Sequence, residues 1–159
     1  MIGLRMAEVS LGGRVILRDV DVALRAGEFV AIVGPNGAGK TTTLRCLAGI
    51  FPPSSGSIFI AGKDLLADPV AAKRELAFFS DEPRLFEHLT LRQHLLFTAR
   101  LYQVVDAEDR LWPLLEQLEL TDKADQLPGE LSRGMKQKVA LAGALIHEPR
   151  LIMLDEPLT

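Results

Sequence analysis

The feature that most constrains this chain is a glycine-rich segment that fits the pattern Gly, four residues, Gly-Lys-Thr. It lies between the continuously apolar run 29–33, which predicts a parallel strand covered on both faces, and a predicted helix over 39–49. Glycines let successive backbone N–H groups turn toward phosphate oxygens, and the positive end of a helix adds to their field. This context favours a phosphate-binding loop over an ordinary glycine-rich turn with a solvated lysine. The candidate nucleotide-binding residues are Gly34, Pro35, Asn36, Gly37, Ala38, Gly39, Lys40, Thr41 and Thr42.

Two side chains of this loop have defined chemical tasks in such a site. Lys40 is expected to reach the β- and γ-phosphates, and the Thr41 hydroxyl to bind Mg²⁺. The ion bridges those phosphates and neutralises the charge that grows during phosphoryl transfer. The loop therefore predicts ATP and Mg²⁺ as ligands.

An acidic pair follows the second continuously apolar run, residues 151–154, which also predicts a buried strand. A doubly wound sheet binds its ligands at the carboxyl ends of the strands. Asp155 is suited to the Mg²⁺ shell, usually through water, and Glu156 to polarising the water that attacks the γ-phosphate. Such a pair alone is most often a solvated strand end. Combined with Lys40, it predicts a nucleotide hydrolase with Glu156 as its catalytic residue.

A narrower pattern, the segment from Glu130 to Lys138, precedes this acidic pair. It resembles the signature motif of ABC transporter ATPases, which usually reads Leu-Ser-Gly-Gly-Gln or Leu-Ser-Gly-Gly-Met, and residues 139–149 match the helix of that family. The resemblance covers the whole chain. It implies transport-coupled ATP hydrolysis and a head-to-tail dimer with a second ATP-binding subunit. In that dimer the phosphate loop of one subunit faces the signature residues of the other, here Ser132, Arg133, Gly134 and Met135.

Three positions depart from the family's pattern. Asp81 stands where the Q-loop glutamine is expected, and its carboxylate is a candidate contact for Mg²⁺ or the attacking water. Arg133 replaces the first signature glycine, so its guanidinium either grips phosphate or crowds it. Leu11 stands near the position where most relatives stack an aromatic ring on adenine.

The resemblance also implies an α/β fold. It is a P-loop NTPase with a mixed sheet core, an N-terminal antiparallel β-subdomain and a helical signature subdomain, incomplete at the C-terminus. The expected division is residues 1–80 for the β-subdomain and phosphate loop, 81–131 for the Q-loop and helical subdomain, and 132–159 for the signature helix and acidic strand. Because the family continues into a D-loop and a switch histidine after Thr159, we expect ATP binding with poor hydrolysis, marginal stability and self-association.

Helical periodicity marks the middle of the chain. Thr90 and Gln93 fit a capping box, and Ser132 is a second candidate cap. Pro113 is expected to limit where the helix around it begins. The apolar stripes that predict core-facing helix sides are Leu91, Leu95, Ala99 and Tyr102; Leu111, Leu114, Leu115 and Leu118; and Met135, Val139, Ala142 and Ile146.

Composition limits the partners. The net charge of −3 and pI near 5.6 do not favour nucleic acid. No apolar stretch is long enough to cross a membrane, so we expect a cytoplasmic protein held at the membrane by a separate transmembrane permease subunit.

Cys46 is expected to be buried, and His88, His94 and His147 to be solvated or locally satisfied.

Three functions remain open at this point. The first is an energy-coupling subunit for export, because the segment 81–102 looks like that of multidrug efflux ATPases. The second is a soluble ABC ATPase that acts on ribosomes or nucleic acid. The third is a non-catalytic truncated remnant that binds a nucleotide or only a partner.

Overall fold

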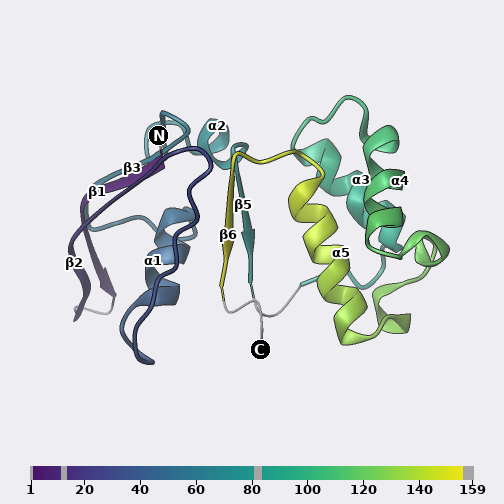
Figure 1. The fold of residues 1–159 in the computed structure, drawn as a ribbon, viewed down its shortest axis with the longest axis horizontal. Helices are drawn as coiled ribbons and strands as arrows, with labels where there is room; N and C mark the ends of the chain where they lie inside the picture. The colour runs from purple at the N-terminus through teal and green to yellow at the C-terminus, as the bar shows by residue number, and fades with distance from the viewer. Residues whose placement is uncertain (1, 12–13, 81–83, 156–159) are drawn as a thin grey trace. The chain divides into compact units, whose positions relative to one another are not determined.

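The computed structural model describes residues 2–11, 14–80 and 84–155. For residues 2–7, 11 and 14 it describes the backbone alone. The chain forms two compact units. Unit 1 comprises the residues up to Phe78 together with Arg150–Asp155, and unit 2 comprises Phe79–Pro149. Figure 1 shows both units and labels all of their helices and strands except the two-residue strand β4 (Lys63–Asp64).

Unit 1 contains a four-stranded antiparallel sheet in the order β2-β1-β3-β4. Its strands are β1 (Ile2–Leu11), β2 (Arg14–Leu24), β3 (Ser55–Ile60) and β4 (Lys63–Asp64). β1 is the centre of this sheet, because it pairs with β2 through Gly3↔Ala23 and with β3 through Leu4↔Ile58. The predicted N-terminal antiparallel sheet is therefore confirmed.

Unit 1 also contains two helices and a second, two-stranded sheet. The helix α1 (Lys40–Leu47) contributes the buried Cys46 to the core, and α2 (Pro69–Lys73) is capped by Asp68, which accepts the Ala71 N–H at 3.0 Å. β5 (Leu76–Phe79) pairs with β6 (Leu151–Leu154). The buried core of this unit consists of Val9, Leu17, Cys46, Leu47, Ala48, Ile58, Ile60, Leu65, Ala72, Leu76 and Met153.

Residues 29–33 contradict the prediction of a buried strand. They form no strand, and the side chains of Phe29 and Val33 are 90% and 89% exposed. In β6, Met153 is buried but Ile152 and Leu154 are more than two fifths exposed, so β6 is not covered on both faces either. A buried parallel strand needs a partner at its edges and cover on its faces. Within the described residues β6 pairs with β5, and no strand pairs with 29–33.

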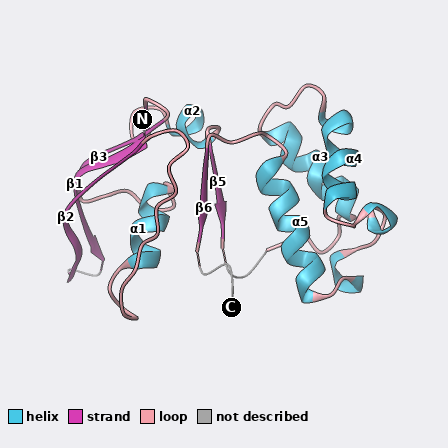
Figure 2. Ribbon diagram, in the orientation of Figure 1, coloured by secondary structure: helices cyan, strands magenta, loops and turns pink. Residues whose placement is uncertain are grey.

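Unit 2 is helical, as Figure 2 shows by colour. It contains α3 (Leu91–Leu101), α4 (Ala107–Gln117) and α5 (Arg133–Leu145), with short 3₁₀ turns at Thr121–Lys123 and Pro128–Glu130. The predicted stripes supply most of its core. The buried core residues are Leu91, Leu95, Ala99, Leu111, Leu115, Leu120, Ala124, Leu131, Val139, Ala142 and Ile146, of which Leu120, Ala124 and Leu131 were not among the predicted stripes. Four residues of those stripes are only partly buried: Tyr102, Leu114, Leu118 and Met135. None of the helices in the described part of the chain is both long and apolar enough to span a membrane.

Helix ends in unit 2 test the capping predictions. Thr90 Oγ1 accepts the Gln93 N–H at 3.3 Å, and Gln93 Oε1 accepts the Thr90 N–H at 3.0 Å, which confirms the capping box. The prediction for Pro113 is wrong, because α4 begins at Ala107 and contains this proline. Interior proline costs about 3 kcal/mol. Burial of Leu111 and Leu115 on either side of it, at about 1.5–3 kcal/mol each, offsets that cost.

His94 is not a solvated or satisfied histidine. It is 9% exposed on α3, its ring lies 5.5 Å from that of Phe86, and its Nδ1 finds no hydrogen-bond partner among the described residues. Burial lowers the pKa of His94 below its ordinary value of 6.5. The neutral ring is therefore the form that the fold accommodates.

We predict that the free energy of unfolding falls as the pH drops below 6.5. A depressed folded-state pKa means that the unfolded chain binds the His94 proton first, so stability is full above 6.5 and declines until the folded-state pKa is passed. Urea unfolding at a series of pH values measures the decline. The His94→Phe variant should lack this component. An identical pH dependence in that variant would refute the assignment.

Candidate nucleotide-binding site

The glycine-rich segment forms a tight loop that leads into α1. The Ala38 N–H donates to the Pro35 carbonyl at 3.2 Å, and Gly37 and Gly39 have φ of 82° and 92°. Gly39 is the N-cap of α1, and a Cβ there would lie 2.8 Å from Leu17 Cδ2 in the core. Positive φ and close packing together make glycine necessary at this position.

The N-terminus of α1 has a positive electrostatic field that suits an anion. It has no side-chain cap and no acidic residue in its first turn, so the positive end of the helix is not neutralised locally. Thr43 holds this turn in place, because its N–H and its Oγ1 both donate to the Gly39 carbonyl, at 2.8 and 2.9 Å. Sequence analysis missed Thr43; its signal is a third threonine one turn after the loop.

The Lys40 ammonium lies against the loop itself. Its Nζ donates to the carbonyl of Gly34 at 2.9 Å and to that of Pro35 at 3.1 Å. These contacts hold the positive charge beside the turn whose N–H groups would meet phosphate. Stronger, charge-assisted acceptors such as phosphate oxygens would compete well for this ammonium.

Thr41 and Asp155 meet although 114 positions separate them. The Thr41 Oγ1 donates to Asp155 Oδ1 at 3.0 Å, and Asp155 is 7% exposed. Neighbouring oxygens around Mg²⁺ lie about 2.9 Å apart when the Mg–O bonds are about 2.05 Å. The chemistry and spacing of this hydroxyl and carboxylate therefore fit residues that would hold Mg²⁺ together with phosphate and water.

The signature residues open α5 in unit 2. Ser132 is its N-cap and accepts the Met135 N–H at 3.2 Å, as predicted. Ser132, Arg133 and Gly134 are exposed, and Met135 packs at the margin of the helical core. An exposed helix N-terminus is a surface that suits an anion.

Three predicted positions cannot be placed in this geometry. Glu156 and Asp81 lie outside the described residues, as does the side chain of Leu11. In the remainder of the loop, Pro35, Asn36 and Ala38 are exposed, and Thr42 is half-buried in the first turn of α1. The structure thus joins Thr41 with Asp155 in unit 1 and describes Ser132–Met135 within unit 2.

Solved structures share this fold. Over 99% of this chain and 67% of its own, a structure described as the ATP-binding subunit of an ABC transporter superposes with a TM-score of 0.93 and 36% identity. The cbiO1 protein of Clostridium perfringens, described as part of the ABC transporter complex cbiONQ, matches with a TM-score of 0.79 and 25% identity, over 96% of this chain and 64% of that one.

Sequence comparison gives a consistent answer. The chain is 43% identical over 137 residues to the SkfA peptide export ATP-binding protein SkfE of Bacillus subtilis, which covers 85% of this chain and 56% of that protein. It is 38% identical over 160 residues to the sulfate/thiosulfate import ATP-binding protein CysA of Synechococcus elongatus, covering 98% and 46%. The chain thus spans about half the length of these relatives. The family model described as ABC transporter matches residues 17–159. With the predicted α/β fold also confirmed, this chain belongs to the ABC transporter family, as an ATP-binding domain.

Proposed function

We propose that this chain binds ATP with Mg²⁺, hydrolyses it slowly, and serves as an energy-coupling subunit for a separate transmembrane permease. The observation that carries the proposal is the contact of Thr41 with Asp155 beside the glycine loop. It brings a hydroxyl and a carboxylate together at the one helix start that also carries Lys40. These are the groups that binding of a magnesium–nucleotide requires.

The loop would bind the phosphates in two ways. Backbone N–H groups around Gly37–Gly39 and at the start of α1 donate to phosphate oxygens, and Lys40 leaves the two carbonyls to pair with them. Bound Mg²⁺ would supply positive charge for the developing transition state. Thr41 and Asp155 would orient the phosphates by holding that ion's shell.

Glu156 is the proposed catalytic residue. It follows Asp155 directly, and its carboxylate would accept the proton of the attacking water. Slow turnover is supported by residues 29–33, which lead into the loop but form no strand and expose Phe29 and Val33. A loop whose entering segment is not held in a sheet is poorly preorganised, and misplacement of about 1 Å can cost 100-fold in rate.

The proposed assembly is a head-to-tail dimer. The N-terminus of α5 at Ser132–Met135 would face the γ-phosphate bound by a second ATP-binding subunit. Asp81 is proposed to contact Mg²⁺ or the attacking water. The division of the chain into three parts, 1–80, 81–131 and 132–159, also stays a proposal. The permease would hold the dimer at the cytoplasmic face of the membrane. The net charge of −3 does not support a nucleic-acid partner.

Export is the proposed direction. The peptide-export relative SkfE is 43% identical, whereas the importer CysA is 38% identical over a longer stretch. Reconstitution with the permease in vesicles, with ATP outside, tests it. Accumulation of substrate inside the vesicles supports export, because the ATP-exposed face corresponds to the cytoplasm. Loss of preloaded substrate contradicts it.

Asp155→Asn is expected to weaken Mg²⁺-dependent binding of a fluorescent ATP analogue roughly 10- to 100-fold. The reason is that the negative charge of the Asp155 carboxylate, which would hold the Mg²⁺ shell, is lost. Binding in EDTA should change little. The matched control Asp125→Asn replaces an exposed aspartate of unit 2 and should bind like the parent chain. Equal Mg²⁺ dependence in all three proteins would disprove the metal role of Asp155.

Phosphate release from the same samples tests the catalytic half of the proposal. Slow release that disappears in Glu156→Gln supports the role given to Glu156. Turnover at a rate usual for enzymes, about 1–1000 per second, would contradict the expected slow hydrolysis.

A further inference from the structure

The strand β6 leads directly to Asp155, and its first residue is bound by Glu75. The N–H groups of Arg150 and Leu151 both donate to the Glu75 carbonyl, at 2.9 and 3.0 Å. Asp155, at the other end, accepts the Thr41 hydroxyl. The segment that contains β6 is thus held at both ends, at Arg150 and Leu151 before and within the strand and at Asp155 directly after it.

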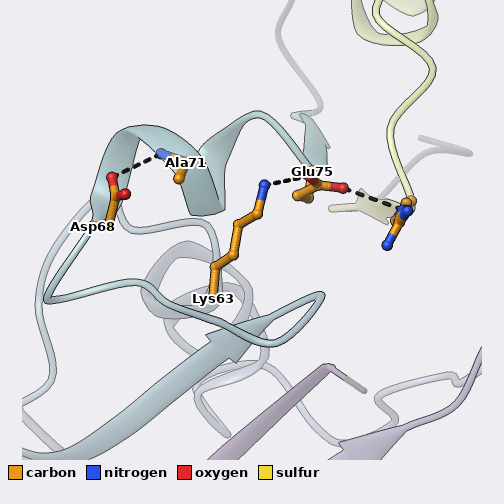
Figure 3. A network of polar contacts seen from close by, with 5 residues as sticks. Lys63, Asp68, Ala71 and Glu75 are labelled. Carbon is orange, nitrogen blue, oxygen red and sulfur yellow. Dashed lines mark hydrogen bonds and ion pairs between the residues drawn. The ribbon is translucent and has the colours of Figure 1, made fainter.

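The Glu75 side chain makes further contacts at the start of β6. Its Oε1 pairs with Lys63 Nζ, as Figure 3 shows, and its Oε2 lies 3.4 Å from Arg150 Nε. Lys63 belongs to β4 of the four-stranded sheet, and Arg150 directly precedes β6. Glu75 therefore ties the four-stranded sheet to the start of β6.

The charge of Glu75 matters more than its bulk. Its side chain is 21% exposed and lies between two cations, so a neutral replacement would leave both without their carboxylate. Lys63 and Arg150 are 40% and 73% exposed, so solvent screens both pairs and their contribution to global stability is small. Their consequence is local, at the entry to β6.

We propose that Glu75 is a positioning residue for the metal-binding carboxylate of Asp155. A strand of this length spans about 13 Å, so a shift at its first residue is passed along the backbone to its last. Asp155 needs its oxygen within hydrogen-bond reach of Thr41, and a small shift of β6 would open that contact. The inference rests on the proposed role of Asp155.

The test measures Mg²⁺ affinity of the complex with a fluorescent ATP analogue. Glu75→Gln should weaken Mg²⁺ binding roughly threefold to tenfold, as expected for loss of two screened ion pairs. Analogue binding in EDTA should stay unchanged. In the Asp155→Asn background, Glu75→Gln should have no further effect, because the carboxylate that it positions is absent. Glu108→Gln, which breaks an exposed pair with Arg92 in unit 2, is the matched control and should leave Mg²⁺ affinity unchanged.

Two results would overturn the inference alone. One is a Glu75→Gln chain that melts earlier but keeps its Mg²⁺ affinity, which would make the role purely structural. The other is an equal Mg²⁺ effect with and without Asp155. If Asp155→Asn itself leaves Mg²⁺ affinity unchanged, the proposed function of Asp155 fails and this inference with it. If Glu75→Gln does not fold, Arg150→Gln provides the test. It removes only the more exposed cation of the two that pair with Glu75, so it should weaken Mg²⁺ binding by a smaller factor.

Discussion

Replacing Lys40 by alanine is expected to weaken ATP binding by roughly 30-fold to several thousandfold, corresponding to about 2–5 kcal/mol. The ammonium is the charged side chain that the structure places on the loop, where it contacts the Gly34 and Pro35 carbonyls. It would exchange these neutral acceptors for phosphate oxygens on binding, so its loss removes the stronger, charge-assisted bonds. Calorimetric titration of ATP–Mg²⁺ measures the change.

The matched control is Lys138→Ala. Lys138 also donates to a backbone carbonyl, that of Leu118 at 2.9 Å, but it belongs to unit 2. Lys40→Ala loses two lysine–carbonyl contacts, whereas Lys138→Ala loses one such contact and an exposed ion pair with Glu119. Each variant thus loses one lysine and two polar contacts, so similar small changes in melting temperature are expected. Affinity for ATP should fall in Lys40→Ala alone. If the two variants bind ATP equally well, Lys40 does not contact the phosphates.

The second large effect concerns self-association. Phe29 and Val33 are about nine tenths exposed, and Ile152 and Leu154 of the same unit are also partly open. Burying a side chain such as Phe or Val contributes about 1.5–3 kcal/mol, so association that covers these exposed side chains is favourable. The Phe29→Ser/Val33→Ser double variant should lower the association constant by roughly two orders of magnitude. Sedimentation velocity over a wide concentration range measures this constant.

Val105→Ser provides the comparison for this experiment. Val105 is 98% exposed but lies in unit 2, between α3 and α4. It should associate like the parent chain, and the parent's melting temperature should depend on protein concentration. A monomeric parent with a cooperative, concentration-independent melt would show that the exposed apolar residues of unit 1 do not drive association.

Much of the candidate site followed from residue pattern. The glycine loop was predictable because positive φ, helix dipole and lysine charge act within a few residues of one another, as seen at Gly37, Gly39 and Lys40. The caps at Thr90 and Ser132 are equally local. The meeting of Thr41 with Asp155 was predictable from a general rule, that ligands bind where strands of an α/β sheet end.

The wrong predictions concern burial. An apolar run at 29–33 resembles a buried strand whether or not another strand pairs with it, so pattern does not reveal its exposure. Pro113 predicts a helix boundary, but Leu111 and Leu115 pack in the core of unit 2, and this packing keeps Pro113 inside α4. The surroundings of His94 likewise depend on Phe86 and on the helical core.

Residue identity and spacing were sufficient for the phosphate loop, the helix caps and the α/β class, because their causes lie in backbone conformation and near neighbours. Tertiary structure alone decided three other features. It left 29–33 uncovered, buried His94 without a partner for Nδ1 among the described residues, and made Glu75 the anchor of β6 between Lys63 and Arg150. Each of these depends on which distant segments meet, and burial and pairing are properties of those contacts rather than of local sequence.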